Sequence, residues 1–137
     1  MSGTRRRLDA AMLVARALEA LLTLLPQGGD TVWAAPLAEL RWYATGLSSE
    51  AKLLQLTGNL LLLAPLAVLA TLRWPGASPL RLGGAAVAVA VGIEVLQWAL
   101  PLGRVVSPVD AGLNTVGAVL AVRAAGFLSG SLRATAS

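Results

Sequence analysis

The side chains that could do chemistry in this sequence are acids, carboxamides and an arginine that interrupt or join long apolar segments. They are Asn59, Glu94, Gln97, Arg104, Asp110 and Asn114. The chain holds no Cys and no His, which excludes disulfides, thiolate nucleophiles, imidazole bases and Cys/His zinc sites. What remains is hydrogen bonding, ion pairing and carboxylate acid–base chemistry. Two carboxylates, Glu94 and Asp110, are too few to predict a metal site, and we expect no metal and no cofactor.

The composition indicates that these polar residues sit in a membrane protein. Of 137 residues, 56% are apolar and only 13% are charged, whereas a soluble domain carries about a quarter charged residues. A domain this small has too high a ratio of surface to volume to be covered by so few charges. The net charge is +4, but the dense basic cluster, Arg5–Arg7, abuts an apolar run, which is typical of a topology signal. We therefore expect a single membrane domain over residues 1–137 and no nucleic-acid partner.

Four apolar segments predict an all-α, polytopic protein, a bundle of four transmembrane helices. Their approximate ranges are 8–25, 53–72, 82–100 and 109–128. The second is free of charge and has about the 20 residues needed to cross a hydrocarbon core of about 30 Å. The first is the weakest because it contains Arg16 and Glu19, which share a helix face and could pair. A first helix lying along the membrane surface is the alternative.

Positive charge predicts the orientation. With the N-terminus inside, four crossings place Arg73, Arg81 and the tail with Arg133 inside as well, as the positive-inside rule favours. Both termini are then cytoplasmic. The outer loop between the first two segments carries Trp33, Trp42 and Tyr43, and Trp98 lies near the outer end of the third, which suits an interfacial aromatic belt.

The polar residues converge on the outer end of the bundle. Asn59 lies six residues into the second segment and Glu94 six before the end of the third, so both lie about 9 Å below the same surface at 1.5 Å per residue. Gln97 follows Glu94 on one helix face, and Asp110 and Asn114 share a face of the fourth helix. Charged groups inside a membrane face the bundle and find partners, so these side chains predict a binding site at the outer face. Hydrogen bonds that only hold helices together are the structural alternative.

The order of these residues resembles the VanZ-like family of small polytopic proteins of the bacterial cytoplasmic membrane. The similarity lies in Glu94-x-x-Gln97, Gly103-Arg104, and Asp110-x-x-x-Asn114-Thr115-x-Gly117, with Asn59 and Pro65 upstream, over roughly residues 53–122. Leu63, Ala67 and Ala121 depart from the family pattern. The family's namesake is associated with resistance to the glycopeptide teicoplanin. The resemblance therefore implies a role in the cell envelope, and carries no catalytic residue over.

Three functions follow as alternatives. In the first, favoured here, the polar residues bind a lipid head group, a cell-wall precursor or a glycopeptide at the outer face, and Arg104 meets a phosphate or carboxylate. In the second, Glu94 and Asp110 are the acid and base of an enzyme acting on a lipid-linked phosphate. In the third, the protein is a structural accessory subunit of the membrane. We lean against the enzyme because the chain lacks His and Cys.

Overall fold

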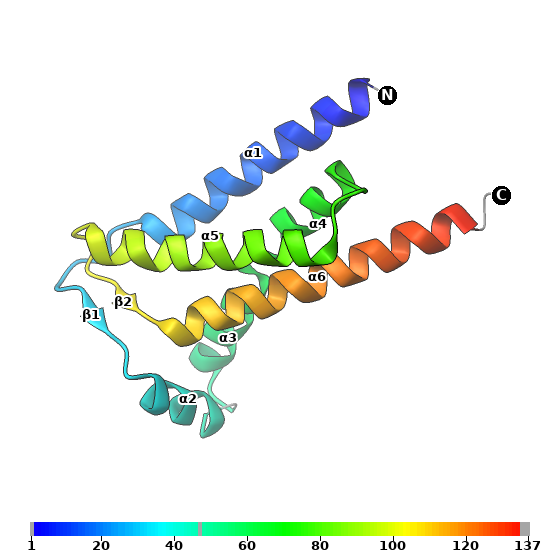
Figure 1. Cartoon of the computed structure of the whole chain (residues 1–137). Coiled ribbons are helices and arrows are strands. Elements are labelled where there is room, and N and C mark those ends of the chain that lie inside the picture. The colour runs from blue at the N-terminus through cyan, green and yellow to red at the C-terminus, as the bar shows by residue number, and fades with distance from the viewer. Residues whose placement is uncertain (1, 47, 135–137) are drawn as a thin grey trace.

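The protein is a bundle of helices in the computed structural model, which describes residues 2–46 and 48–134. These residues form six helices and two short strands (Figure 1). The elements, in chain order, are α1 (Ser2–Leu24), β1 (Val32–Trp33), α2 (Pro36–Ala44), α3 (Glu50–Leu62), α4 (Ala64–Arg73), α5 (Pro79–Ala99), β2 (Val105–Val106) and α6 (Pro108–Ala134). The expected all-α class is therefore correct apart from the two strands.

The second expected segment is two helices rather than one. α3 ends at Leu62 and α4 begins at Ala64, with Leu63 between them. Pro65 lies at the start of α4; it has no N–H to donate and its ring collides with the carbonyl four residues earlier, so it bends a continuous helix. The hydropathy of the segment could not reveal this bend, but the proline could have. Together α3 and α4 still form one apolar stretch, Glu50–Arg73, long enough to cross a membrane.

Three stretches have the length and composition of transmembrane spans: Glu50–Arg73, Pro79–Ala99 and Pro108–Ser131. Large apolar side chains on all three are exposed to the surroundings, such as Leu54, Leu80 and Phe127, as expected of helices whose solvent is lipid. The protein is thus a multi-pass membrane protein. Four spans are not confirmed, because the charges near and inside α1 exclude it from this group.

The core is built from small side chains around α6. α3, α4 and α5 all pack mainly on α6, and the buried cluster at their centre is Leu63, Ala67, Ala90, Ala118 and Val122. Small residues let helix backbones approach closely in a membrane, where burying apolar surface gives no advantage over lipid. This explains why so much of the large apolar surface points outward.

α1 runs along the bundle and is fastened at both ends. It packs mainly on α4, and at its N-terminal end Asp9 pairs with Arg73 at 2.7 Å. At its other end, Gln97 donates a hydrogen bond to the Thr23 carbonyl. α1 begins and α6 ends at the same end of the bundle (Figure 1). The expected pair of Arg16 with Glu19 is not formed: among the described residues, the ion pair is that of Arg73 with Asp9.

Two loops meet at the opposite end of the bundle, where the polar residues gather. β1 and β2 pair in parallel, with Val32 opposite Val105 and Trp33 opposite Val106. Gly103 has a φ of 62°, and a Cβ placed there would collide with the backbone of Gly28. Glycine alone adopts this left-handed backbone without strain and allows so close an approach. The Gly in the Gly-Arg motif therefore joins the loop after α1 to the loop before α6.

Candidate functional site

A pocket of about 470 Å³ at this end of the bundle is lined by all of the polar residues singled out in the sequence. They are Asn59 from α3, Glu94 and Gln97 from α5, Arg104 from the loop, and Asp110 and Asn114 from α6. Thr23, Gln27 and Gln55 add further polar groups to its wall. The structure thus brings together side chains from four helices and two loops, because α1, α3, α5 and α6 all end or begin here.

Ser107, which the sequence reasoning did not select, is the centre of a hydrogen-bond network beside the pocket. It is fully buried. Its backbone N–H donates to Glu94 Oε2 at 2.6 Å, and its hydroxyl accepts from the Asp110 N–H at 2.9 Å. The hydroxyl thereby caps the N-terminus of α6. Ser107-x-x-Asp110 is the pattern of a capping box, and this pattern could have identified Ser107 from the sequence.

The carboxylate of Asp110 is free of its usual capping role because Glu94 has taken the Ser107 N–H. Asp110 Oδ1 instead accepts a hydrogen bond from the Tyr43 hydroxyl at 2.9 Å, and Asn59 Nδ2 lies 3.5 Å from the same hydroxyl. Tyr43 is buried, so its assignment to an exposed aromatic belt is wrong. Burial, together with the neighbouring Asp110 carboxylate, raises the pKa of the Tyr43 phenol. The phenol therefore stays protonated and acts as a donor.

Two motif residues, Gln97 and Arg104, bind the C-terminal turn of α1. Arg104 Nη2 donates to the Leu22 carbonyl at 2.8 Å and Arg104 Nε to the Leu25 carbonyl at 3.0 Å. Gln97 Nε2 donates to the Thr23 carbonyl at 2.9 Å. The last carbonyls of a helix have no partner within the helix, and a cation is favourable there. Arg104 therefore uses two of its five N–H donors to hold α1, and three remain for a ligand.

Arg104→Leu should detach the end of α1. Two carbonyls lose their donor, and hydrogen bonds to a charged group are worth about 1.5–3 kcal/mol when shielded from water; because Arg104 is only half-buried, we expect a loss of about 1–2 kcal/mol. Thermal unfolding in detergent measures it. Arg41→Leu, at an exposed arginine of the same end, is the control and should change little. Equal unfolding of the two variants would contradict the capping role.

Glu39 brings a third carboxylate to the network. Its Oε2 accepts a hydrogen bond from the Ser107 hydroxyl at 2.6 Å. Burial raises the pKa of Glu39 above its usual 4.5, and the Asp110 carboxylate adds to the rise, although the Ser107 hydroxyl opposes it. Glu39 was not among the residues predicted from the sequence, because it lies in α2, outside the apolar segments that predict spans.

The raised pKa of Glu39 predicts a pH dependence of stability. Below pH 4.5 the carboxyl is protonated in both the folded and the unfolded chain, so its contribution is complete. As the pH rises through the higher folded pKa, the group ionises where charge is disfavoured, and the contribution is lost. Glu39→Gln should therefore reduce the loss of thermal stability as the pH is raised above 4.5. Glu50→Gln, at an exposed acid, serves as the control; the same flattening in both variants would contradict the assignment.

One polar side chain in the pocket has no partner. Asn114 is 2% exposed, and its Oδ1 accepts no hydrogen bond. Burying an unpaired polar group costs about 1–3 kcal/mol. Glu19, on α1, has a buried Oε1 in the same condition. An unpaired acceptor at the wall of a pocket thus offers a place for a donor from outside the chain.

Within the described chain, no group of three or more acids is arranged to hold a metal ion.

Comparison with protein families identifies the chain. The model of the VanZ/LLP1 family matches residues 11–129, a longer stretch than residues 53–122, whose motifs carry the resemblance. The match includes most of α1, which the structure holds through Gln97 and Arg104. Comparison with curated proteins and with solved structures finds no match. Since the family model covers most of its length, this chain belongs to the VanZ/LLP1 family.

Proposed function

We propose that the pocket binds the head group of a lipid or of a lipid-linked cell-wall precursor at the outer face of the membrane. The observation that carries this proposal is Asn114, whose Oδ1 is buried in the pocket wall without a donor. A side chain that only held helices together would be paired with one of them. A ligand that donates a hydrogen bond to Asn114 offsets the cost of burying it.

The ligand supplies donors rather than acceptors. The pocket wall holds the carboxylates of Glu94 and Asp110 and the Asn114 oxygen, and no described cation pairs with either acid. Arg104, the cation in the wall, donates from Nε and Nη2 to α1. Ammonium and hydroxyl groups fit such a surface, because they donate several hydrogen bonds each. We therefore favour the amine of a lipid head group or the hydroxyls of a lipid-linked sugar over a bare phosphate.

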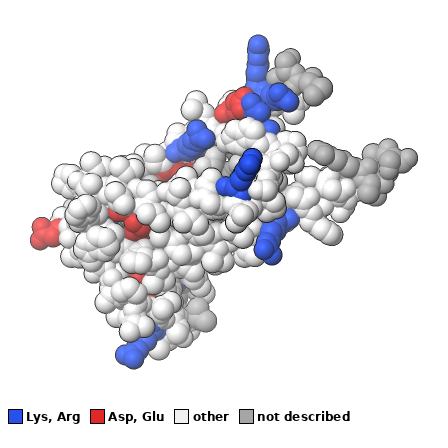
Figure 2. Space-filling model, viewed as in Figure 1, with Lys and Arg blue, Asp and Glu red and all other residues white. Residues whose placement is uncertain are grey.

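The outer location rests on a proposed topology in which α1 is the fourth span and both termini are cytoplasmic. α1 has 23 residues, which is about 35 Å of helix, and it contacts the bundle near both of its ends. Figure 2 shows most of the visible basic side chains toward the end that carries the N-terminus, with a further basic group at the opposite end, where most of the acidic side chains lie. The positive-inside rule then favours a cytoplasmic N-terminus. Arg133, also counted in this argument, has a side chain outside those described.

Binding can be tested with the full chain in lipid nanodiscs. The probes are phosphatidylethanolamine and a lipid-linked disaccharide-peptide precursor of the cell wall, each mixed into phosphatidylcholine, and the readout is the lipid retained in native mass spectrometry. We expect one or both probes to be retained in preference to phosphatidylcholine. No preference for either probe would overturn the proposal. Chemical conversion of the precursor would instead favour the enzyme with Glu94 and Asp110 as acid and base.

Membership of the VanZ/LLP1 family supports a contribution to glycopeptide tolerance as the cellular consequence. A bacterium deleted for the protein should become more sensitive to teicoplanin, and the intact chain should restore growth. The antibiotic panel should include cell-wall inhibitors that are not glycopeptides, because a change common to all of them would indicate a general weakening of the envelope. Unchanged sensitivity to the whole panel would contradict a role in tolerance.

A further inference from the structure

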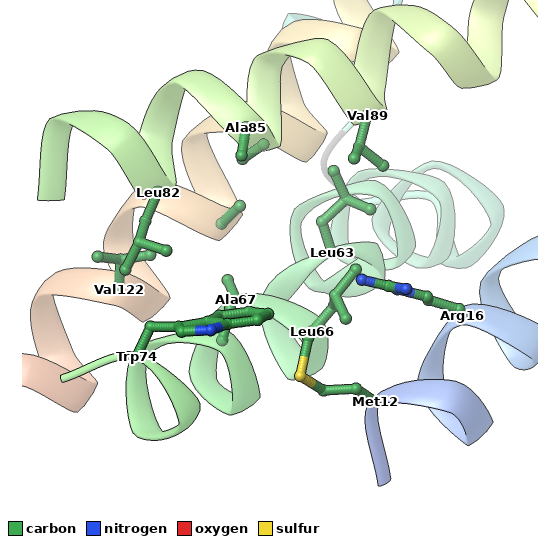
Figure 3. Close-up of a pocket in the computed structure, with 13 residues that line it drawn as sticks. Met12, Arg16, Leu63, Leu66, Ala67, Trp74, Leu82, Ala85, Val89 and Val122 are labelled. Atoms are coloured by element: carbon green, nitrogen blue, oxygen red, sulfur yellow. The ribbon is translucent and has the colours of Figure 1, made fainter. Parts of the chain in front are cut away.

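A second cavity, of about 260 Å³, lies in the other half of the bundle and is built quite differently from the polar pocket. Its wall comes from α1, α4, α5 and α6 and from Trp74, and every lining residue is apolar except Arg16 (Figure 3). α4 and α5 pack on α6 more than on each other, which leaves space between them above Ala118 and Val122. The cavity is not enclosed, so it opens toward whatever surrounds the bundle.

Lipid hydrocarbon is the surroundings at this depth. The lining residues from Leu63 to Ala70, from Leu82 to Val89, and at Ala118 and Val122 all lie within the three candidate spans. A void beside acyl chains forfeits the dispersion contacts of its lining, and interiors are close-packed for that reason. An apolar cavity that opens among acyl chains is therefore filled by one.

Arg16 indicates which polar group the occupant of the cavity carries. Figure 3 shows its side chain reaching from α1 into the cavity, beside Leu63 and Leu66. The guanidinium makes no ion pair with any described residue, although Glu19, three residues further along α1, is near enough to interact with it electrostatically. A charge within a membrane is retained where it finds a partner. Because Glu19 makes no direct contact, the N–H donors of Arg16 are left for an oxygen acceptor carried on a hydrocarbon chain.

The nearby charges favour an anionic lipid. Arg16 lies seven residues from Asp9, whose pair with Arg73 marks the end of the bundle, so it is about 10 Å below that end. The ester groups of a phospholipid lie deeper in the membrane than its phosphate. Arg16 likewise lies below the end of the bundle, at the level of ester groups rather than of phosphates. Arg81 and the cluster Arg5–Arg7 are exposed at the same end, and basic residues at a membrane surface attract anionic lipids. We propose that the cavity holds one acyl chain of an anionic phospholipid, whose ester oxygens accept hydrogen bonds from Arg16.

The test uses the whole protein in nanodiscs of equal parts phosphatidylglycerol and phosphatidylcholine, with retained lipid measured by native mass spectrometry. Wild type should retain phosphatidylglycerol in preference. Arg16→Leu should reduce retention of both lipids about tenfold, because both carry ester oxygens and the variant loses one charge-assisted hydrogen bond to them. Ala85→Phe, which places a ring in the cavity, should reduce retention of both lipids about tenfold, as removal of most of the chain's contacts would.

Matched variants keep this test decisive. Ala88→Phe, at an exposed residue of α5 outside the cavity lining, and Arg41→Leu, at the opposite end of the bundle, should retain lipid as wild type does. Arg16→Leu exchanges a charge for an apolar side chain among lipid-facing residues, so it keeps the fold. Unchanged lipid retention in Arg16→Leu, no preference of wild type for phosphatidylglycerol, or equal losses in Ala88→Phe and Ala85→Phe would overturn the proposal. So would a dimer that Ala85→Phe dissociates, because a second copy would then fill the cavity.

Discussion

Gly117→Ala should destabilise the protein by about 3 kcal/mol or more, the upper end of the range for overpacking a core. A Cβ built on Gly117 would overlap the backbone carbonyl of Leu60 in α3. A flexible side chain could move aside, but a helix backbone cannot, so α3 and α6 must separate. Asn59, the residue before Leu60, lines the polar pocket, so the site would open as the two helices separate. Thermal unfolding in detergent and the yield of folded protein measure the effect.

Gly126→Ala is the matched control on the same helix. A Cβ at Gly126 meets nothing within 4 Å, and alanine within a helix is more stable than glycine by about 0.5–1 kcal/mol. The two variants therefore make the same chemical change and should move stability in opposite directions. If Gly117→Ala unfolded as late as Gly126→Ala, the close contact between α3 and α6 would be wrong. The opposite result, early unfolding of Gly117→Ala, would explain the motif glycine of Asn-Thr-x-Gly by this contact rather than by ligand binding.

Asn114→Leu should stabilise the empty protein and abolish binding in the polar pocket. The substitution removes a buried acceptor that has no donor, a group that costs about 1–3 kcal/mol, and leucine can extend into the neighbouring cavity. A ligand that donates to Asn114 loses its hydrogen bond and meets an apolar side chain, so affinity should fall about tenfold to a hundredfold. The measurements are thermal unfolding without ligand and lipid retention in nanodiscs.

The sign of the stability change in Asn114→Leu distinguishes a structural role of Asn114 from a binding role. If Asn114 held helices together, Asn114→Leu would unfold earlier than wild type, because a stabilising hydrogen bond would be lost. Thr115→Val is the control: the Thr115 hydroxyl donates to the Ala111 carbonyl of its own helix, and Thr115 lies outside the polar pocket. This variant should bind and unfold nearly as wild type does. A loss of stability in Asn114→Leu with retained binding would refute the proposed site.

The sequence by itself determined the membrane class, the helical fold and the residues of the polar pocket. Composition and apolar length suffice for the first two, because a bilayer admits helices of one length and few charges. The pocket residues could be found because polar groups inside a membrane are costly and must gather. Their depth along each helix follows from a fixed rise per residue, so Asn59 and Glu94 could be placed at one level before any contact was known.

Only the tertiary structure decided what each of these residues does. Arg104 and Gln97 donate hydrogen bonds to carbonyls of α1. Glu94 accepts one from the Ser107 N–H, and Asn114 Oδ1 has no donor. Tyr43, which the sequence assigned to the membrane surface, is buried and donates a hydrogen bond to Asp110. Hydrogen-bond partners far apart in the chain depend on how helices rotate and where loops end, and neither hydropathy nor spacing encodes these. Depth is a property of one helix, whereas pairing is a property of several.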